Sequence, residues 1–252
     1  MTNVLVCVKR VPDVAGEVLL TPDGQGIDAR FVGFTVSAHE SCAVELAVRI
    51  AAAGGGTATV LTLGPAEAVE QLRSALGVGC GAAVHIEADP GRFGPADVAA
   101  EIAAVVAEGD HDLVLLGNDA ADSGDFQVGI RLAHELGRPV VNGVRTVEVG
   151  ADGVLTAQGD GPEGSETFRV PLPAVVTVLE GGVEPRYPTI TGRMKAKKVA
   201  VRVVAPRREP QGTGRLGLTL PPAAPSVVEV LGTGPDAAPA VVDLLQSLGV
   251  TR

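Results

Sequence analysis

The chain has 252 residues and a formal net charge of −10; 46% of its residues are hydrophobic but only 2% are aromatic. Such a core must be built from Val, Leu, Ile and Ala, as in an α/β domain whose parallel strands are covered on both faces. The acidic balance argues against a nucleic-acid-binding protein, although it is also ordinary for a soluble protein. Three widely separated cysteines argue against a disulfide framework and a cysteine-based zinc site.

The N-terminal stretch predicts a strand rather than an export signal. Its short apolar run, residues 3–8, ends at Lys9 and Arg10 and has no basic region before it. No stretch of the sequence approaches the length of a membrane span. We therefore expect a cytoplasmic protein in a reducing compartment.

Strand and helix patterns alternate through the first half of the chain. Ser37 is a capping residue with Glu40 three positions later, which predicts a helix that ends at 54–56. Further helices are expected to begin near residues 65, 95 and 126, and the Val-rich runs predict strands at 3–8, 57–63, 82–88 and 112–117. This alternation predicts a doubly wound, mostly parallel, Rossmann-like sheet with helices on both faces.

The pattern changes from about residue 144. Short alternating runs separated by glycines, within 144–170, predict a small antiparallel excursion. Two later runs, 174–180 and 198–204, predict further strands, the first of them in the main sheet.

The C-terminal part is rich in proline and predicts an extended arm. The arm ends in a helix whose apolar side chains share one face: Val241, Leu244, Leu245 and Leu248. That face needs a groove to cover it. We therefore expect an α/β domain over 1–204 and an arm with a partner-contacting helix over 205–252.

Familiar catalytic motifs give no support for an enzyme. Residues 212–217 match GxGxxG, but a Pro-rich stretch follows where the dinucleotide motif requires a helix. We therefore interpret the match as a chance one. No GxSxG elbow or Walker-type loop is present. The histidines have no metal-ligand spacing: His39, His85, His111 and His134. We expect neither catalytic residues nor a metal site.

The loop GNDAADSGDFQVG, residues 117–129, is the best candidate for a ligand site in the predicted alternation of strands and helices. It joins the carboxyl end of a strand to a helix, where open α/β sheets bind their ligands. Gly117 allows close backbone approach, and amides at 125–128 would suit a phosphate. Three aspartates repel phosphate, so backbone amides would have to hold it. The alternative is an ordinary helix-capping loop.

The stretch EPRYPTITGRMKAKK, residues 184–198, contains the single tyrosine and three of the four lysines. Two prolines stiffen its start, and a short helix is expected from Thr189. Ile190 and Met194 would share a face of that helix, beside basic residues. Exposed apolar anchors of this kind indicate contact with a protein partner, and the alternative is a solvated turn with a basic end.

These stretches carry a family resemblance. Residues 172–198 closely resemble the signature region of the electron transfer flavoprotein beta subunit. The stretches VLVCVKRVPD, AVELAVRI, LTLGPAEA and DLVLLGNDAADSGDFQVG resemble that family in the same order, and the terminal DLLQSLG resembles its last helix. The resemblance covers nearly the whole chain.

The resemblance implies an electron carrier rather than an enzyme. In the family, an alpha subunit makes most contacts to a redox-active FAD, and the beta subunit holds AMP as a structural nucleotide. The pair passes electrons from flavin dehydrogenases, including acyl-CoA dehydrogenases of fatty acid oxidation, towards a quinone oxidoreductase. The cofactor supplies the redox chemistry, which accounts for the missing catalytic groups.

Two alternatives stay open. Some family members bind a second FAD in place of AMP and bifurcate electrons. A stand-alone nucleotide-binding protein of the universal-stress type would share the α/β layering of residues 1–142. It would leave 184–198 and the C-terminal arm without a purpose.

The resemblance also implies site residues. The expected AMP or second-FAD contacts are Cys7, Ser37, Leu63, Gly117, Asn118, Asp119, Ala120, Ala121, Asp122, Ser123, Gly124, Asp125, Phe126, Gln127 and Val128. The expected dehydrogenase-docking residues are Tyr187, Ile190, Met194, Lys195, Lys197 and Lys198.

The chain departs from the family pattern near both expected sites. Ile190 stands where the family commonly has a Leu anchor, Thr191 replaces a Pro, and Arg193 replaces an apolar residue. Val14 stands where some members have an aromatic residue near the flavin, and Asp160 aligns with an acidic residue near the FAD. The choice of dehydrogenase therefore does not follow from the resemblance.

Overall fold

The computed structural model describes residues 1–13, 18–222 and 228–251. Contacts divide the chain into two units, Met1–Leu218 and Thr219–Arg252. The beginning of the expected arm, residues 205–218, belongs to the first unit. The domain boundary after residue 204 stays a prediction.

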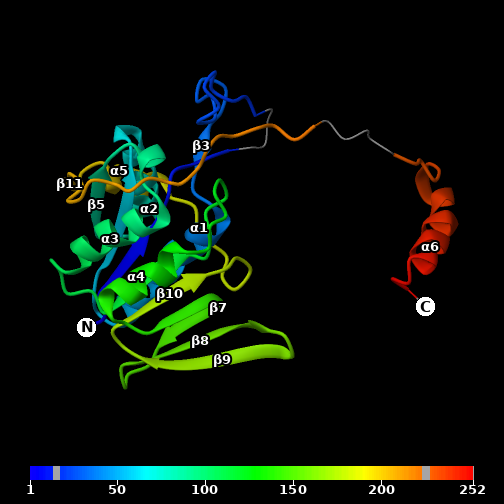
Figure 1. Cartoon of the computed structure of the whole chain (residues 1–252). Coiled ribbons are helices and arrows are strands. Elements are labelled where there is room, and N and C mark those ends of the chain that lie inside the picture. Colours follow the sequence, from blue (N-terminus) through cyan, green and yellow to red (C-terminus); the bar gives the residue numbers. More distant parts are fainter. Residues whose placement is uncertain (14–17, 223–227, 252) are drawn as a thin grey trace. The chain divides into compact units, whose positions relative to one another are not determined.

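Strands of the first unit form one large sheet (Figure 1). Its spatial order is β11-β5-β4-β1-β6-β10-β7-β8-β9. The strands are β1 (Val4–Cys7), β4 (Ala58–Gly64), β5 (Ala82–Glu87), β6 (Leu113–Gly117), β7 (Val140–Val149), β8 (Val154–Gly161), β9 (Gly164–Pro171), β10 (Ala174–Val178) and β11 (Val201–Val204). Neighbours from β11 to β7 run parallel, whereas β8 and β9 are antiparallel. The mostly parallel sheet with an antiparallel excursion is confirmed.

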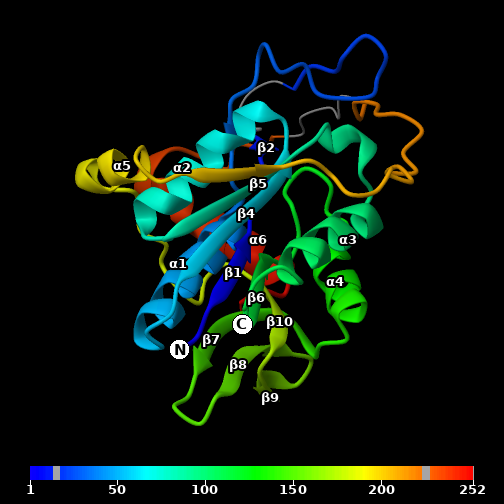
Figure 2. The same ribbon diagram turned by 90° about the vertical axis from the view of Figure 1, so that its left-hand side faces the viewer.

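Helices cover both faces of this sheet (Figure 2). On one face, α1 (Ala38–Ala53) and α2 (Val69–Val78) pack on alternate strand residues such as Val4 and Val6. On the other face, α3 (Pro95–Val106) and α4 (Val128–Leu136) pack on Leu5 and its neighbours. Strands buried on both faces explain the continuous Val and Leu runs of the sequence.

Several short elements complete the first unit. A small antiparallel pair, β2 (Val11–Pro12) and β3 (Phe34–Thr35), lies outside the main sheet. The 3-10 turns η1 (Ala66–Ala68) and η2 (Pro90–Arg92) precede α2 and α3, and α5 (Ile190–Ala196) precedes β11. Thr189 caps α5 by accepting a hydrogen bond from Gly192 N–H at 3.0 Å, as its sequence position predicts.

The order of the strands fixes where a site can lie. After β1 the chain builds β4 and β5 on one side, and it then returns to place β6 on the other side of β1. The register aligns Cys7 with both Leu61 and Leu116, so these parallel strands end at one edge. The gap between the ends of β1 and β6 is the topological switch point, where open α/β sheets bind ligands.

The second unit contains η3 (Gly234–Ala237) and α6 (Ala238–Ser247). The expected apolar face of the last helix is largely uncovered within this unit, since Val241, Leu244 and Leu248 are exposed. None of the helices in the described part of the chain has both the length and the apolar character needed to cross a bilayer.

Candidate functional site at the carboxyl edge of the sheet

A buried carboxylate lies at the centre of the switch point. Glu40, in the first turn of α1, accepts a hydrogen bond from Ser37 N–H at 3.1 Å and one from Ser37 Oγ at 2.8 Å. Its other oxygen accepts the backbone N–H of Lys9 at 2.8 Å, just beyond β1. Burial raises the pKa of Glu40 to about 7, because these hydrogen bonds only partly offset the lost hydration.

The end of β6 approaches the same turn closely. A Cβ added to Gly117 would lie 2.7 Å from Glu40 Cγ and 3.2 Å from His39 Cβ. Only glycine leaves room for this approach, which brings the 117–128 loop against the start of α1. The residue that sequence analysis selected for close backbone contact is therefore in contact with a helix of this same chain.

Two side-chain contacts hold the first half of the 117–128 loop. Lys9 Nζ lies 2.7 Å from Asp122 Oδ1 and 3.5 Å from Ser123 Oγ. His39 Nδ1 lies 2.7 Å from Asp119 Oδ1. Asp122 therefore has a cationic partner in Lys9, which reduces the repulsion that this carboxylate would exert on a phosphate.

A network of polar groups on β10 and β7 hydrogen-bonds to the start of the 117–128 loop. Thr177 of β10 donates to Asn118 Oδ1 at 2.7 Å, and its hydroxyl accepts Gly143 N–H at 2.9 Å. Asn118 N–H also donates to Val178 O at 2.9 Å. Sequence reasoning missed Thr177 and Lys9, because no local pattern shows that β10 and β1 flank β6.

The second half of the loop leads into α4. Phe126 has a left-handed backbone with φ of +55°, unusual for a residue with a bulky side chain, and its ring is largely exposed. The helix consequently begins at Val128 rather than at residue 126 as expected. The first-turn amides of an α-helix have no acceptor within the helix, so those at the start of α4 are free of intrahelical hydrogen bonds.

The remaining predicted contacts lie at the ends of neighbouring strands. Cys7 ends β1, and Leu63 is the next-to-last residue of β4; both side chains are buried. Burial, together with the nearby Glu40 carboxylate, raises the pKa of the Cys7 thiol. Cys7 therefore remains a protonated packing residue, and only its backbone can face a ligand.

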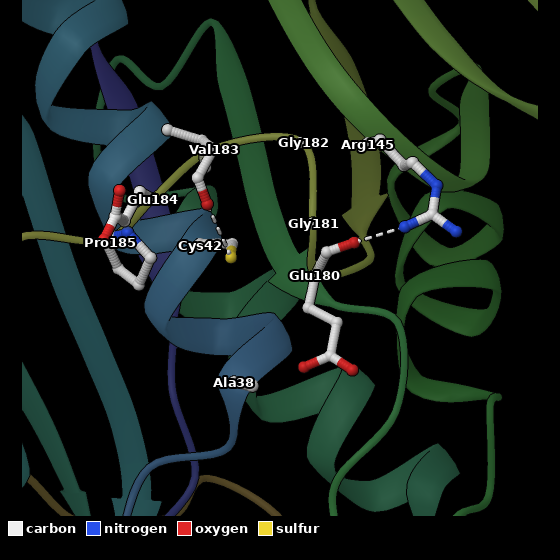
Figure 3. Close-up of a pocket in the computed structure, with 9 residues that line it drawn as sticks. All are labelled: Ala38, Cys42, Arg145, Glu180, Gly181, Gly182, Val183, Glu184 and Pro185. Carbon is white, nitrogen blue, oxygen red and sulfur yellow. Dashed lines mark hydrogen bonds between the residues drawn. The ribbon is translucent and has the colours of Figure 1, made fainter. Parts of the chain in front are cut away.

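A second feature lies beside the carboxyl end of β10 (Figure 3). Residues 180–185 form an open hollow of about 650 Å³ with Ala38 and Cys42 of α1. Arg145 of β7 borders it and donates to Glu180 O at 2.6 Å. The same guanidinium contacts Asp160 Oδ2 at 2.7 Å. The acidic residue that the resemblance singled out is therefore paired at the edge of this hollow, whereas Val14 lies outside the described residues.

The predicted docking residues gather on and around α5. Tyr187, Ile190 and Met194 are 90%, 82% and 63% exposed. Lys195, Lys197 and Lys198 are exposed in and just after its last turn. The segment presents apolar side chains beside positive charge, and its helix packs against α2.

Comparison with known proteins decides the family. The model for the electron transfer flavoprotein domain matches residues 29–208. The chain belongs to the electron transfer flavoprotein family. Its relatives include the electron transfer flavoprotein subunit beta of Mycobacterium leprae, 36% identical over 212 residues, which are 81% of this chain and 79% of the relative.

Relatives from two further organisms give the same result. The subunit beta of Syntrophomonas wolfei is 32% identical over 230 residues, covering 90% of this chain and 89% of the relative. The human subunit beta is 36% identical over 208 residues, covering 81% of each. The predicted resemblance is confirmed. A role in electron transfer flavoprotein function follows for this chain.

Among the residues that the structure describes, no group of three or more His, Cys, Asp or Glu side chains is placed to hold a metal ion. His85, for example, is buried with Nε2 3.0 Å from Gly64 O. The three cysteines are free and buried.

Proposed function

We propose that this chain is the beta subunit of a heterodimeric electron transfer flavoprotein. It holds AMP structurally, and its alpha partner carries the redox-active FAD. The observation that carries the proposal is the meeting of β1, the start of α1 and the 117–128 loop around Glu40 at the switch point. Family membership and the strand order both favour a nucleotide at this edge.

The nucleotide fits the 117–128 loop through backbone groups. Amides at the start of α4 suit a phosphate, and the ion pair of Asp122 with Lys9 reduces the opposing charge. The further contacts proposed are Cys7, Ser37 and Leu63. A second FAD in place of AMP, in a bifurcating variant, would use the same edge.

The proposed flavin-facing side is the hollow bordered by Arg145. A guanidinium fixed by Asp160 and the Glu180 carbonyl places N–H donors beside a wide, open space. Preorganised donors of this kind stabilise electron density that accumulates on a neighbouring reduced flavin. The protein contributes position and electrostatics, and the FAD supplies the redox chemistry.

Segment 184–198 is the proposed docking site for flavin dehydrogenases, among them those that act on acyl-CoA. Its exposed Ile190 and Met194 supply apolar contact, and the lysines form a charged rim. Electrons would then pass from the FAD to a quinone oxidoreductase.

Purification with the alpha subunit tests the proposal. Acid extraction followed by mass spectrometry should find about one AMP and one FAD per heterodimer. Two FAD and no AMP would favour the bifurcating alternative. A heterodimer without any nucleotide beyond the alpha-subunit FAD would refute the structural-nucleotide role, and failure to form a FAD-containing complex would refute the proposal as a whole.

A further inference from the structure

The chain between β10 and α5 crosses two helices on its way to the far edge of the sheet. β10 lies near the middle of the sheet and β11 at one edge. Cys42 Sγ of α1 contacts Val183 O at 3.4 Å, and Pro188 lies against Gly77 of α2. Figure 2 shows α5 beside α2, at the outer limit of the first unit.

The first attachment is a fully buried carboxylate on α1. Glu45 accepts hydrogen bonds from Arg186 Nε, at 2.9 and 2.8 Å, and from the backbone N–H of Arg186 at 3.4 Å. It also accepts one from Arg49 Nε at 2.6 Å. Burial alone would raise the pKa of Glu45, but the hydrogen bonds from Arg186 and Arg49 leave that pKa below its ordinary value. Glu45 therefore stays ionised and holds the chain immediately before Tyr187.

The second attachment is on α2. Arg73 donates from Nη1 to the carbonyls of Ala196 and Val199, at the end of α5. A Cβ added to Gly192 would lie 2.3 Å from Gly77 O, so the two backbones touch. Arg73 thus joins α2 to the last residue of α5 and to the chain just after it, and its positive charge favours that end of the helix dipole.

These attachments account for the existence of α5. A helix of seven residues is not stable by itself in water, since nucleation is costly and few hydrogen bonds follow. Contacts at both ends fix it, while Ile190 and Met194 remain exposed. Preorganised apolar anchors bind a partner at lower ordering cost than the same residues in a mobile loop.

We propose that Arg73 and Glu45 are positioning residues that hold the docking segment in its outward form. The proposal rests on the docking function proposed above. Neither residue needs to touch the dehydrogenase. Loss of either should weaken docking because α5 detaches from the body of the protein.

Trypsin provides a probe of α5 that needs no partner. The segment carries cleavage sites at Arg186, Arg193, Lys195, Lys197 and Lys198. We expect Arg73→Met, in the purified heterodimer, to raise the rate of cleavage within 193–198 about tenfold. Arg73→Lys, which keeps a donor, should restore part of the protection. Arg169→Met is the matched control, because that arginine is exposed and lies on β9, whereas Arg73 lies on α2.

Glu45→Gln provides an independent variant should Arg73→Met fold poorly. Without the carboxylate, Arg186 is released, so cleavage after Arg186 should accelerate similarly. The kinetic readout is reduction of the heterodimer by its purified cognate dehydrogenase, saturated with that enzyme's substrate. The KM for the heterodimer should rise about tenfold, with kcat unchanged. The reason is that α5 contributes to binding of the dehydrogenase and not to electron transfer at the flavin.

The two readouts separate this inference from the docking proposal. Unchanged cleavage in both Arg73→Met and Glu45→Gln would overturn the positioning role, whatever the kinetics show. Faster cleavage with an unchanged KM would uphold the attachment of α5 and instead refute docking at this segment. Faster cleavage with a raised KM, absent from Arg169→Met, supports both.

Discussion

The backbone N–H of Lys9 donates to the buried carboxylate of Glu40 at 2.8 Å, and this bond ties the end of β1 to the first turn of α1. The other carboxylate oxygen accepts two hydrogen bonds from Ser37. A single side chain thus joins a strand end and a helix start at the switch point. Its protonation should be visible in the stability of the fold.

Glu40 gives a prediction about pH. Burial raises its pKa from 4.5 to about 7. The unfolded chain releases this proton first, so between these pH values the folded state binds more protons, and the free energy of unfolding falls as pH rises. Glu40→Gln cannot ionise and should lose less stability across this window, by up to about 3 kcal/mol. Urea unfolding of both proteins at several pH values tests this; identical pH dependence would contradict it.

The same residue shows what the sequence could and could not predict. A Ser37-to-Glu40 capping box is a local pattern, and the helix starts where it indicates. Burial of Glu40 depends on Lys9 and Gly117, which are distant in sequence, so no local pattern reveals it. The alternation of strands and helices was predictable for the same reason as the capping box, because hydrophobic periodicity is local.

The predicted boundaries of helices and strands were wrong where backbone conformation or strand pairing overrode that periodicity. Phe126 has a left-handed backbone conformation, so α4 begins only at Val128. β7 begins at Val140, before the expected change near residue 144, because it pairs with β10 as well as with β8. The hollow beside Arg145 was not predicted at all, since its walls come from α1, β7 and the chain after β10.

Gly117→Ala should destabilise the fold. The added methyl would meet Glu40 Cγ at 2.7 Å and the Glu40 backbone N at 3.1 Å, so β6 or α1 must shift. Overpacking of this kind typically costs about 1–3 kcal/mol in the free energy of unfolding. Gly26→Ala is the control, because nothing lies within 3.9 Å of its added carbon. Equal effects of the two substitutions in urea unfolding would argue against a close approach at Gly117.

Truncation after Leu218 should weaken assembly with the alpha subunit. Apolar Val241, Leu244 and Leu248 are exposed within their own unit and need a covering surface. The cut belongs after Leu218 rather than after Val204, because residues 205–218 are part of the first unit and hydrogen-bond to its helix α3. Glu101 accepts Arg207 N–H at 2.9 Å, and Asp97 accepts Gln211 N–H at 3.0 Å.

Size-exclusion chromatography of the truncated chain with its alpha subunit measures this effect. The truncated protein should keep its thermal unfolding temperature as a monomer and lose co-elution at low concentration. Undiminished co-elution would show that 219–252 contributes nothing to the heterodimer.

Neutralising the lysines of the docking segment should give a mild, salt-sensitive loss. Lys195, Lys197 and Lys198 are exposed, and charges at the rim of an interface act mainly on the association rate. With all three changed to Gln, the rate of heterodimer reduction should fall at low ionic strength and match the parent at high ionic strength. A loss that is independent of salt would point to a direct packing role instead.

Ile190→Ala should slow electron transfer from the cognate dehydrogenase and leave FAD content and subunit assembly intact. Ile190 is 82% exposed on α5, so its removal leaves no cavity in the folded chain. An apolar anchor that leaves a partner pocket costs about 1–3 kcal/mol, or roughly tenfold or more in affinity. Thr191 lacks the restraint of the proline common in the family, which places the expected loss towards the lower value.

The matched control is Ile130→Ala on α4, where the same side chain is 45% exposed away from α5. Reduction of the heterodimer by its dehydrogenase, measured over a range of concentrations, should separate the two variants. Ile190→Ala should need about tenfold more heterodimer for half-maximal rate, whereas Ile130→Ala should behave as the parent. If Ile190→Ala accepts electrons as well as the parent at limiting concentration, α5 does not anchor the dehydrogenase.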